Sequence, residues 1–165
     1  MALRDPEAQV RANAARALAR LDSLPAEAIP LLVACTADPG DGVRLSAALA
    51  LEAAPPGAAH EAMQHLAGDA NWRIRLVAAN SLLAADPGDA RAGAVVVAAL
   101  GDPAPRVRKA ALDLVESLGT NGGTFLEALT ERAGLEQEED LRDVLARLSE
   151  RLGDQAGPDP QPPAV

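Results

Sequence analysis

The stretch DANWRIRLVAANSLL, residues 69–83, holds the one tryptophan of the chain and decides the fold through its spacing. Asp69 stands five positions before Ile74, and Arg75 follows Ile74 directly. Ala78 and Leu82 come four and eight positions after Ile74, which is the apolar spacing of an amphipathic helix. The stretch therefore predicts a turn that leads into a helix, with an acid and an arginine six positions apart at its start.

This arrangement occurs five times along the chain. In each copy an acidic residue precedes, by five positions, a valine, isoleucine or leucine that is followed by arginine. The acid–arginine pairs are Asp5 with Arg11, Asp38 with Arg44, Asp69 with Arg75, Asp102 with Arg108, and Glu136 with Arg142. The steps between successive acids are 33, 31, 33 and 34 residues. A nearly constant step of this length is typical of a repeat protein in which each repeat forms one supersecondary unit.

Shorter apolar segments alternate with the long amphipathic ones, and residues of turn chemistry (Gly, Pro, Asp and Asn) separate them. The short segments cover residues 25–37, 58–67, 89–100 and 124–133. Nine helices are therefore predicted, five long and four short. Because the first long helix covers residues 6–22, the first repeat lacks its first helix. The five repeats lie near residues 1–22, 23–54, 55–85, 86–118 and 119–152.

The composition favours an all-α fold. Hydrophobic residues make up 48% of the 165-residue chain, but it has one Trp, one Phe and no Tyr. A core of Ala, Leu and Val suits helices that pack closely through small side chains better than it suits a β-sandwich. The sequence predicts one repeat domain over residues 1–152 and a disordered, proline-rich tail over residues 153–165.

The repeated residues resemble those of a known family. The pattern Asp-Pro, Val-Arg, Ala-Ala and Leu, with a partner helix such as AIPLLVACTAD (residues 28–38) that contains Pro30, resembles HEAT repeats, especially the short bacterial kind named after phycobilisome lyases. The resemblance covers about residues 3–152. It implies a right-handed α-solenoid of about five HEAT-like repeats, in which the second helix of each repeat lines the concave face. It also implies that the repeated acids and arginines form a structural ladder of hydrogen bonds and ion pairs between neighbouring repeats.

A helical wheel of the long helices, at about 100° per residue, predicts which residues are left for binding. The repeated apolar residue and the one four positions later face the core, as Val10 and Ala14 do in the first repeat, and Leu21 continues this face. Residues two, six and nine positions after the repeated apolar residue lie on the opposite face of the helix, away from the core. In the middle repeats these residues predict an apolar patch for a protein or peptide partner. The predicted patch consists of Leu45, Leu49, Leu76 and Leu83, with Trp72, Arg73 and Asn80 at its border. The alternative is that neighbouring helices cover these leucines.

No catalytic, cofactor-binding or metal-binding residue is predicted. His60 and His65 are five positions apart, whereas a zinc-binding helix needs its histidines four apart. Cys35 lies in an apolar segment and predicts a buried, inert thiol. The net charge of −9, with a single lysine, argues against nucleic-acid binding, and no apolar run is long enough for a membrane span.

The predicted function is that of a cytoplasmic, non-catalytic scaffold or adaptor that binds a partner helix or peptide on its concave face. Two alternatives stay open at this point. The resemblance also implies an enzyme or enzyme subunit of the bilin-lyase kind, and a weak nucleic-acid binder is the further alternative.

The N-terminal helix over residues 6–22 predicts a second contact. Its flank carries Ala8, Ala12, Ala15 and Ala19, whose small side chains allow another helix to approach closely. The expected partner is either a second copy of the chain or a segment of a longer protein.

Overall fold

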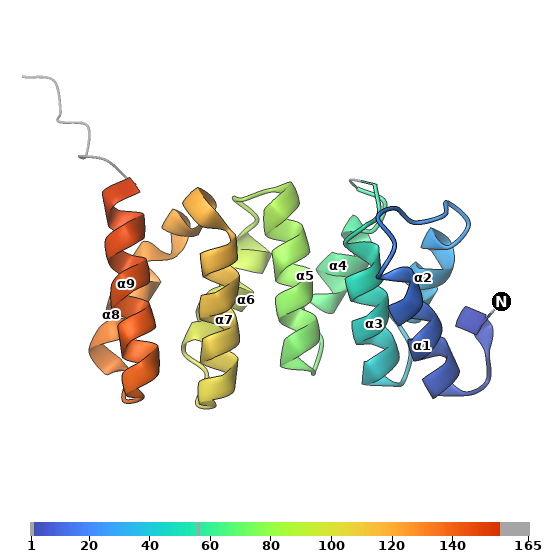
Figure 1. The fold of residues 1–165 in the computed structure, drawn as a ribbon, viewed down its shortest axis with the longest axis horizontal. Coiled ribbons are helices and arrows are strands. Elements are labelled where there is room, and N and C mark those ends of the chain that lie inside the picture. The colour runs from blue at the N-terminus through green and yellow to red at the C-terminus, as the bar shows by residue number, and fades with distance from the viewer. Residues whose placement is uncertain (1, 56, 156–165) are drawn as a thin grey trace, which may run out of the picture. The chain divides into compact units, whose positions relative to one another are not determined.

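The computed structural model describes residues 2–55 and 57–155, which form nine α-helices, two 3-10 helices and no strand (Figure 1). The all-α class and the number of helices predicted from the sequence are confirmed. In chain order the elements are η1 (Ala2–Arg4), α1 (Ala8–Leu18), α2 (Ile29–Cys35), α3 (Asp41–Leu51), α4 (His60–Leu66), α5 (Trp72–Ala85), α6 (Ala90–Leu100), α7 (Pro105–Ser117), η2 (Gly119–Phe125), α8 (Leu126–Leu135) and α9 (Glu139–Gln155). We call α1, α3, α5, α7 and α9 the B helices, because they carry the repeated arginines, and α2, α4, α6 and α8 the A helices.

Two compact units divide the chain within α6: unit 1 is Met1–Val95 and unit 2 is Val96–Val165. In unit 1, α3 packs against α1 and α5, while α2 packs on α3 and α4 on α5. Figure 1 shows α1, α3 and α5 side by side, with α2 and α4 behind them. In unit 2, α9 packs against α7 and α8, and η2 contacts all three helices. Helix pairs that stack on their neighbours in this way form an α-solenoid.

The core of each unit is made of small aliphatic side chains. The repeated apolar residue of each B helix is at most 6% exposed in the second to fifth repeats, and the residue four positions later is fully buried. The two sets are Val43, Ile74, Val107 and Leu141, and Ala47, Ala78, Ala111 and Leu145. Alanine at the second position costs little side-chain entropy and lets the helix backbones approach closely.

The first repeat departs from this pattern, so two predictions for α1 are wrong. Val10 and Leu21, expected in the core, are 38% and 44% exposed, whereas Ala12 and Ala15, expected on a free flank, are buried. The reason is that α1 packs against α3 and the three-residue η1, while α3, α5 and α9 each have an A helix as well. Leu3 of η1 is the side chain that is buried at this end of unit 1.

Several helix ends differ from the predicted ones. The first long helix begins at Ala8, after a turn in which the carboxylate of Asp5 accepts from the amide of Glu7, and it ends at Leu18. α2 begins at Ile29, with Pro30 in its first turn, where proline costs no backbone hydrogen bond. The glycine-rich connector after α7 forms η2, into which Gly119 turns the chain with a φ of 58°.

The last helix extends beyond its predicted end. α9 runs to Gln155, so residues 153–155, which the sequence assigned to the tail, are helical. The buried side chain of Leu152 anchors this last part of the helix. Residues 156–165, the rest of the predicted tail, lie outside the described residues.

Candidate functional site

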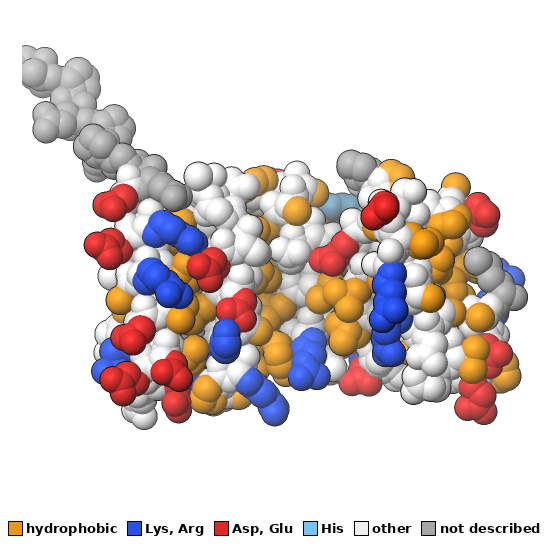
Figure 2. Space-filling view, viewed as in Figure 1, with side chains coloured by type: hydrophobic (Ala, Val, Ile, Leu, Met, Phe, Trp, Pro, Cys, Tyr) orange, Lys and Arg blue, Asp and Glu red, His pale blue; other side chains and the backbone are white. Residues whose placement is uncertain are grey.

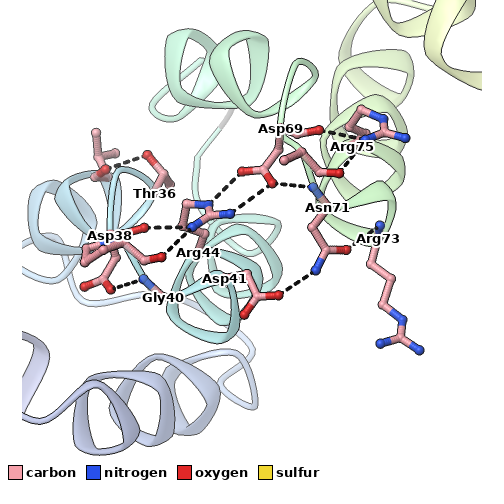
Figure 3. A network of polar contacts seen from close by, with 12 residues as sticks. Thr36, Asp38, Gly40, Asp41, Arg44, Asp69, Asn71, Arg73 and Arg75 are labelled. Atoms are coloured by element: carbon pink, nitrogen blue, oxygen red, sulfur yellow. Dashed lines mark hydrogen bonds and ion pairs between the residues drawn. The ribbon is translucent and has the colours of Figure 1, made fainter.

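Arginines of the ladder join the loops of neighbouring repeats (Figure 3). The guanidinium of Arg44 donates from Nε and Nη2 to the carboxylate of Asp69 in the next repeat, at 2.7 and 3.1 Å. Its Nη1 donates to two backbone oxygens of its own loop, those of Asp38 and Pro39. Two further pairs have this arrangement, Arg11 with Asp38 and Arg108 with Glu136.

The acids of these pairs also fix their own loops. The carboxylates of Asp38 and Asp69 each accept a hydrogen bond from the backbone amide two residues later, at 2.9 and 2.8 Å. The hydrogen bond from Arg11 lowers the pKa of Asp38, and the one from Arg44 lowers the pKa of Asp69. Both carboxylates therefore stay ionised and paired at neutral pH. These hydrogen bonds and ion pairs join neighbouring repeats, and their role is therefore structural.

Four other ladder residues bind within their own loops. Arg75 donates to two backbone oxygens at 2.7 and 3.0 Å, and Arg142 does so at 3.3 and 3.1 Å. The carboxylates of Asp5 and Asp102 accept from backbone amides at 2.9 and 2.8 Å. For Asp5 and Arg142, the residues that the structure describes provide no ion pair.

The predicted patch of four leucines requires a correction. Leu76 and Leu83 are only 6% and 2% exposed, so they cannot contact a partner. The helix that carries both leucines, α5, packs against α3 and α4, so less of its surface is left facing outward. The outward stripe of α5 is therefore narrower than the wheel predicts, whereas Lys109 and Asp143, at the position of Leu76 in their own helices, are exposed. Leu49 remains 41% exposed, and Leu45 is half-buried.

The remaining predicted residues, together with Glu52, form what we call the α3–α5 surface, which consists of Leu45, Leu49, Glu52, Trp72, Arg73 and Asn80. Figure 2 shows hydrophobic side chains gathered between α3 and α5, with basic and acidic side chains around them. Hydrogen bonds at both ends hold the two helices in parallel alignment. Asn71 donates to Asp41 at 2.9 Å at one end, and Asn80 donates to Glu52 at 3.2 Å at the other.

Trp72 and Arg73 lie at the start of α5. The side chain of Asn71 caps this helix by accepting from the amide of Arg73 at 3.0 Å. The guanidinium of Arg73 lies 5.1 Å from the centre of the Trp72 ring, within the range of a cation–π interaction. The indole is half-buried and Arg73 is exposed, so this end of the α3–α5 surface offers a positive charge beside an aromatic ring.

A cleft of about 420 Å³ opens at the other end of the α3–α5 surface. Glu52 and Asn80 line it together with His60 and Met63 of α4. The Glu52 carboxylate reaches the surface, but the cleft walls reduce its solvation, which raises its pKa. Sequence reasoning missed Glu52 as a site residue, although an acid that ends an otherwise apolar helix face was a usable signal.

The B helices of unit 2 present a charged face. Lys109 and Asp113 of α7 form an exposed ion pair at 3.0 Å. They line a groove of about 280 Å³ between α7 and α9, together with Glu138 and Asp140. Figure 2 shows acidic and basic side chains over α9. Among the described residues of the B helices, Leu49 of unit 1 is the exposed leucine.

Two kinds of site receive no support within residues 2–55 and 57–155. No three His, Cys, Asp or Glu side chains come together as ligands for a metal ion. None of the helices is both long and apolar enough to cross a membrane.

Comparisons with known proteins agree on the repeat architecture. Residues 1–82 match the family model described as HEAT repeats. A crystal structure of an engineered protein from the Northeast Structural Genomics Consortium is similar, with a TM-score of 0.55 and 16% sequence identity over 93% of this chain and 94% of that chain. At this identity the likeness concerns the fold alone. No curated protein matches the chain.

Proposed function

Because this chain is a HEAT-repeat protein, we propose that it is a non-catalytic interaction module that binds a helix or an extended peptide of a partner protein on the α3–α5 surface. HEAT repeats generally serve as protein-interaction scaffolds. The observation that carries the proposal is the exposed Leu49, which lies between a basic, aromatic end and an acidic end of one surface.

The α3–α5 surface has the features of a small binding site. Leu49 offers apolar area for the centre of a contact, and the half-buried Leu45 adds to it. Arg73 and Asn80 are seven residues apart on α5, which corresponds to about 10 Å along the helix axis. A bound segment of two to three helical turns spans this distance.

The charges at the two ends define the chemistry of the partner. The exposed guanidinium of Arg73 favours an acidic group, and the carboxylate of Glu52 favours a basic or hydrogen-bond-donating group. The partner segment therefore carries an apolar side chain at its centre, an acid toward Arg73 and a donor toward Glu52. Because the two ends differ in charge, the segment binds in one direction only.

A displayed library of helical peptides tests the proposal. Peptides are selected on the wild-type chain, and their binding is then measured on Leu49→Glu and on Leu135→Glu. Leu135 is the matched control, since it is also an exposed leucine but lies in α8 of unit 2. We expect selected peptides to lose at least about tenfold in affinity for Leu49→Glu and to bind Leu135→Glu as they bind the wild type.

The fluorescence of Trp72, the single tryptophan, provides an independent readout. Binding on the α3–α5 surface covers the half-buried indole, so its emission shifts to shorter wavelength and acrylamide quenches it less. Selected peptides that bind both variants equally, or that leave Trp72 as accessible as before, contradict the proposed site.

A further inference from the structure

We infer that the chain associates head to tail with a second copy of itself, with α9 of one copy packed beside α1 of the next. In this arrangement Arg142 of one copy pairs with Asp5 of the next copy. The inference concerns the ends of the ladder and is independent of the α3–α5 surface.

The first argument comes from the geometry of the ladder. In each complete pair an arginine donates to the carbonyls six and five positions before it and to the carboxylate of the following repeat, as Arg108 does. Arg142 contacts the carbonyls at the same two positions, those of Glu136 and Gln137, but through Nε and Nη2, the two atoms that bind the carboxylate in the complete pairs. No carboxylate among the described residues accepts from Arg142. To bind a carboxylate of a further repeat as Arg108 does, the guanidinium turns so that Nη1 takes over the two carbonyls and Nε and Nη2 become free.

At the other end of the ladder, the Asp5 carboxylate has the loop contact of a paired acid but no arginine partner among the described residues. The Asp5 carboxylate accepts from the amide of Glu7 at 2.9 Å, as the Asp38 carboxylate accepts from Gly40 at the same distance. Asp38 also binds Arg11 of the preceding repeat, whereas no described residue forms an ion pair with Asp5. The acceptor is therefore preorganised, and the donor needs a rotation within one side chain that is already held near its loop.

A second row of contacts between B helices supports the same docking. In two repeats, the acid nine positions after the repeated apolar residue binds a side chain of the next B helix. Counted from the repeated apolar residue of its own repeat, that side chain stands at position six or ten. The two observed cases are Glu52 with Asn80 at 3.2 Å and Glu116 with Arg151 at 3.4 Å. In α9 the ninth position is Glu150, and in α1 the sixth and tenth positions are Arg16 and Arg20. All three are exposed, so Glu150 of one copy meets an arginine of the next.

The flank of α9 also has the shape for such a contact. The fifth position after the repeated residue is buried in each of the first four repeats, where it is Ala15, Ala48, Ala79 or Leu112. In α9 it is Ala146, which is exposed. A small side chain there leaves room for another B helix at the distance that separates α1 from α3.

The overall charges of the two ends are opposite. Residues 1–22 hold four arginines and three acids, whereas residues 126–154 hold nine acids and four arginines. One pairing across the proposed contact is unfavourable. Glu139 of one copy and Glu7 of the next stand at the positions that Asp41 and Asn71 have in the contact between α3 and α5, so two carboxylates meet there. Both carboxylates are exposed, so salt screens their repulsion. The balance favours attraction at low ionic strength.

Head-to-tail contact has a specific consequence for assembly. The two surfaces differ, so each copy offers one of each, and association continues until a ring closes or an open chain forms. The mean mass therefore rises with concentration instead of stopping at a dimer, and it falls with added salt.

Sedimentation of the full chain from micromolar to millimolar concentration tests the inference. Asp5→Arg and Arg142→Glu each place like charges at the contact, and we expect each to weaken association at least about tenfold. Mixed in equal amounts, the two variants can pair Glu at 142 of one with Arg at 5 of the other, so the mixture associates again. This rescue excludes misfolding as the cause of the loss.

Three results overturn the inference: a wild-type chain that stays monomeric at every concentration, single variants that associate like the wild type, or a mixture that stays monomeric. Leu49→Glu serves as the control, because it lies outside this contact and is expected to associate like the wild type. Its behaviour keeps this test separate from that of the α3–α5 surface.

Discussion

Arg108 and Glu136 form a bidentate ion pair, with Nε to Oε2 and Nη2 to Oε1 both at 2.7 Å, although 28 positions separate them in the chain. The Glu136 side chain is 1% exposed and also accepts from Arg132 and from two backbone amides. These hydrogen bonds, first of all that from Arg108, lower the pKa of Glu136 to about 2. The pair is the most deeply buried ion pair of the ladder.

Arg108→Met is expected to destabilise the chain by about 3 kcal/mol, because it leaves the buried carboxylate of Glu136 without its main partner. Urea unfolding followed by circular dichroism measures this loss. Lys109→Met is the control, since Lys109 is adjacent in sequence but pairs with Asp113 at the surface. We expect a change below about 0.5 kcal/mol there. Equal losses in the two variants would show that burial does not set the strength of the pair.

Stability is expected to fall as the pH drops from about 4.5 toward 2. The unfolded chain takes up a proton at Glu136 near the ordinary pKa of 4.5, whereas the folded chain does so at about 2. The lowered pKa values of Asp38 and Asp69 act in the same direction. Glu136→Gln removes one of these groups, so its unfolding free energy should depend less on pH over this range. A slope identical to that of the wild type contradicts the assignment.

Glu52→Gln is expected to stabilise the chain at neutral pH. Burial raises the pKa of Glu52 above its ordinary 4.5, so its contribution to stability is present in acid and is lost as the pH rises through the raised pKa. Glutamine keeps an acceptor oxygen for Asn80 and carries no charge. Melting temperatures at neutral pH and near pH 4 check this, and the gain should vanish in acid. Glu116→Gln, at the same position of α7, is the control, because this change removes an ion pair with Arg151 and is not expected to stabilise the chain.

Gly122→Ala is expected to cost about 2 kcal/mol through overpacking. A Cβ on Gly122 would lie 2.7 Å from the backbone oxygen of Val115, which cannot move without distorting α7. Gly123→Ala is the matched control, because a Cβ there meets nothing within 4 Å. Thermal unfolding compares the two neighbours. If both variants unfold like the wild type, the tight packing of η2 on α7 is wrong.

The repeat architecture could be predicted from the sequence because one pattern marks both the turn and the core of each repeat. An acid and an arginine six positions apart identify the loop, and Val43 with Ala47 identifies the buried face that follows. Five copies of the pattern made the number and order of the helices predictable.

The exposed surface could not be predicted in the same way. A wheel divides a helix into two faces, but a B helix is covered by its A helix and by neighbouring B helices, which leaves only a narrow stripe. Leu76 and Leu83 therefore lie inside, while Val10 is exposed because no A helix covers it in the described structure. The contact of Glu52 with Asn80 joins two helices 28 positions apart, and periodicity within one helix carries no information about it.

Each paired arginine of the ladder holds two loops at once, an arrangement that we call the clasp, and it also limits how the chain can change in length. Arg11 binds its own loop and the acid of the next loop, and both bonds recur with the sequence period. Deleting residues 38–68 would bring Asp69 to the place of Asp38, where the same guanidinium could hold it. One or two extra residues in the helical part just before the arginine would instead rotate its side chain by about 100° each and break the clasp. We therefore expect the loss or gain of a whole repeat to preserve these contacts, and a small insertion before the arginine to break them.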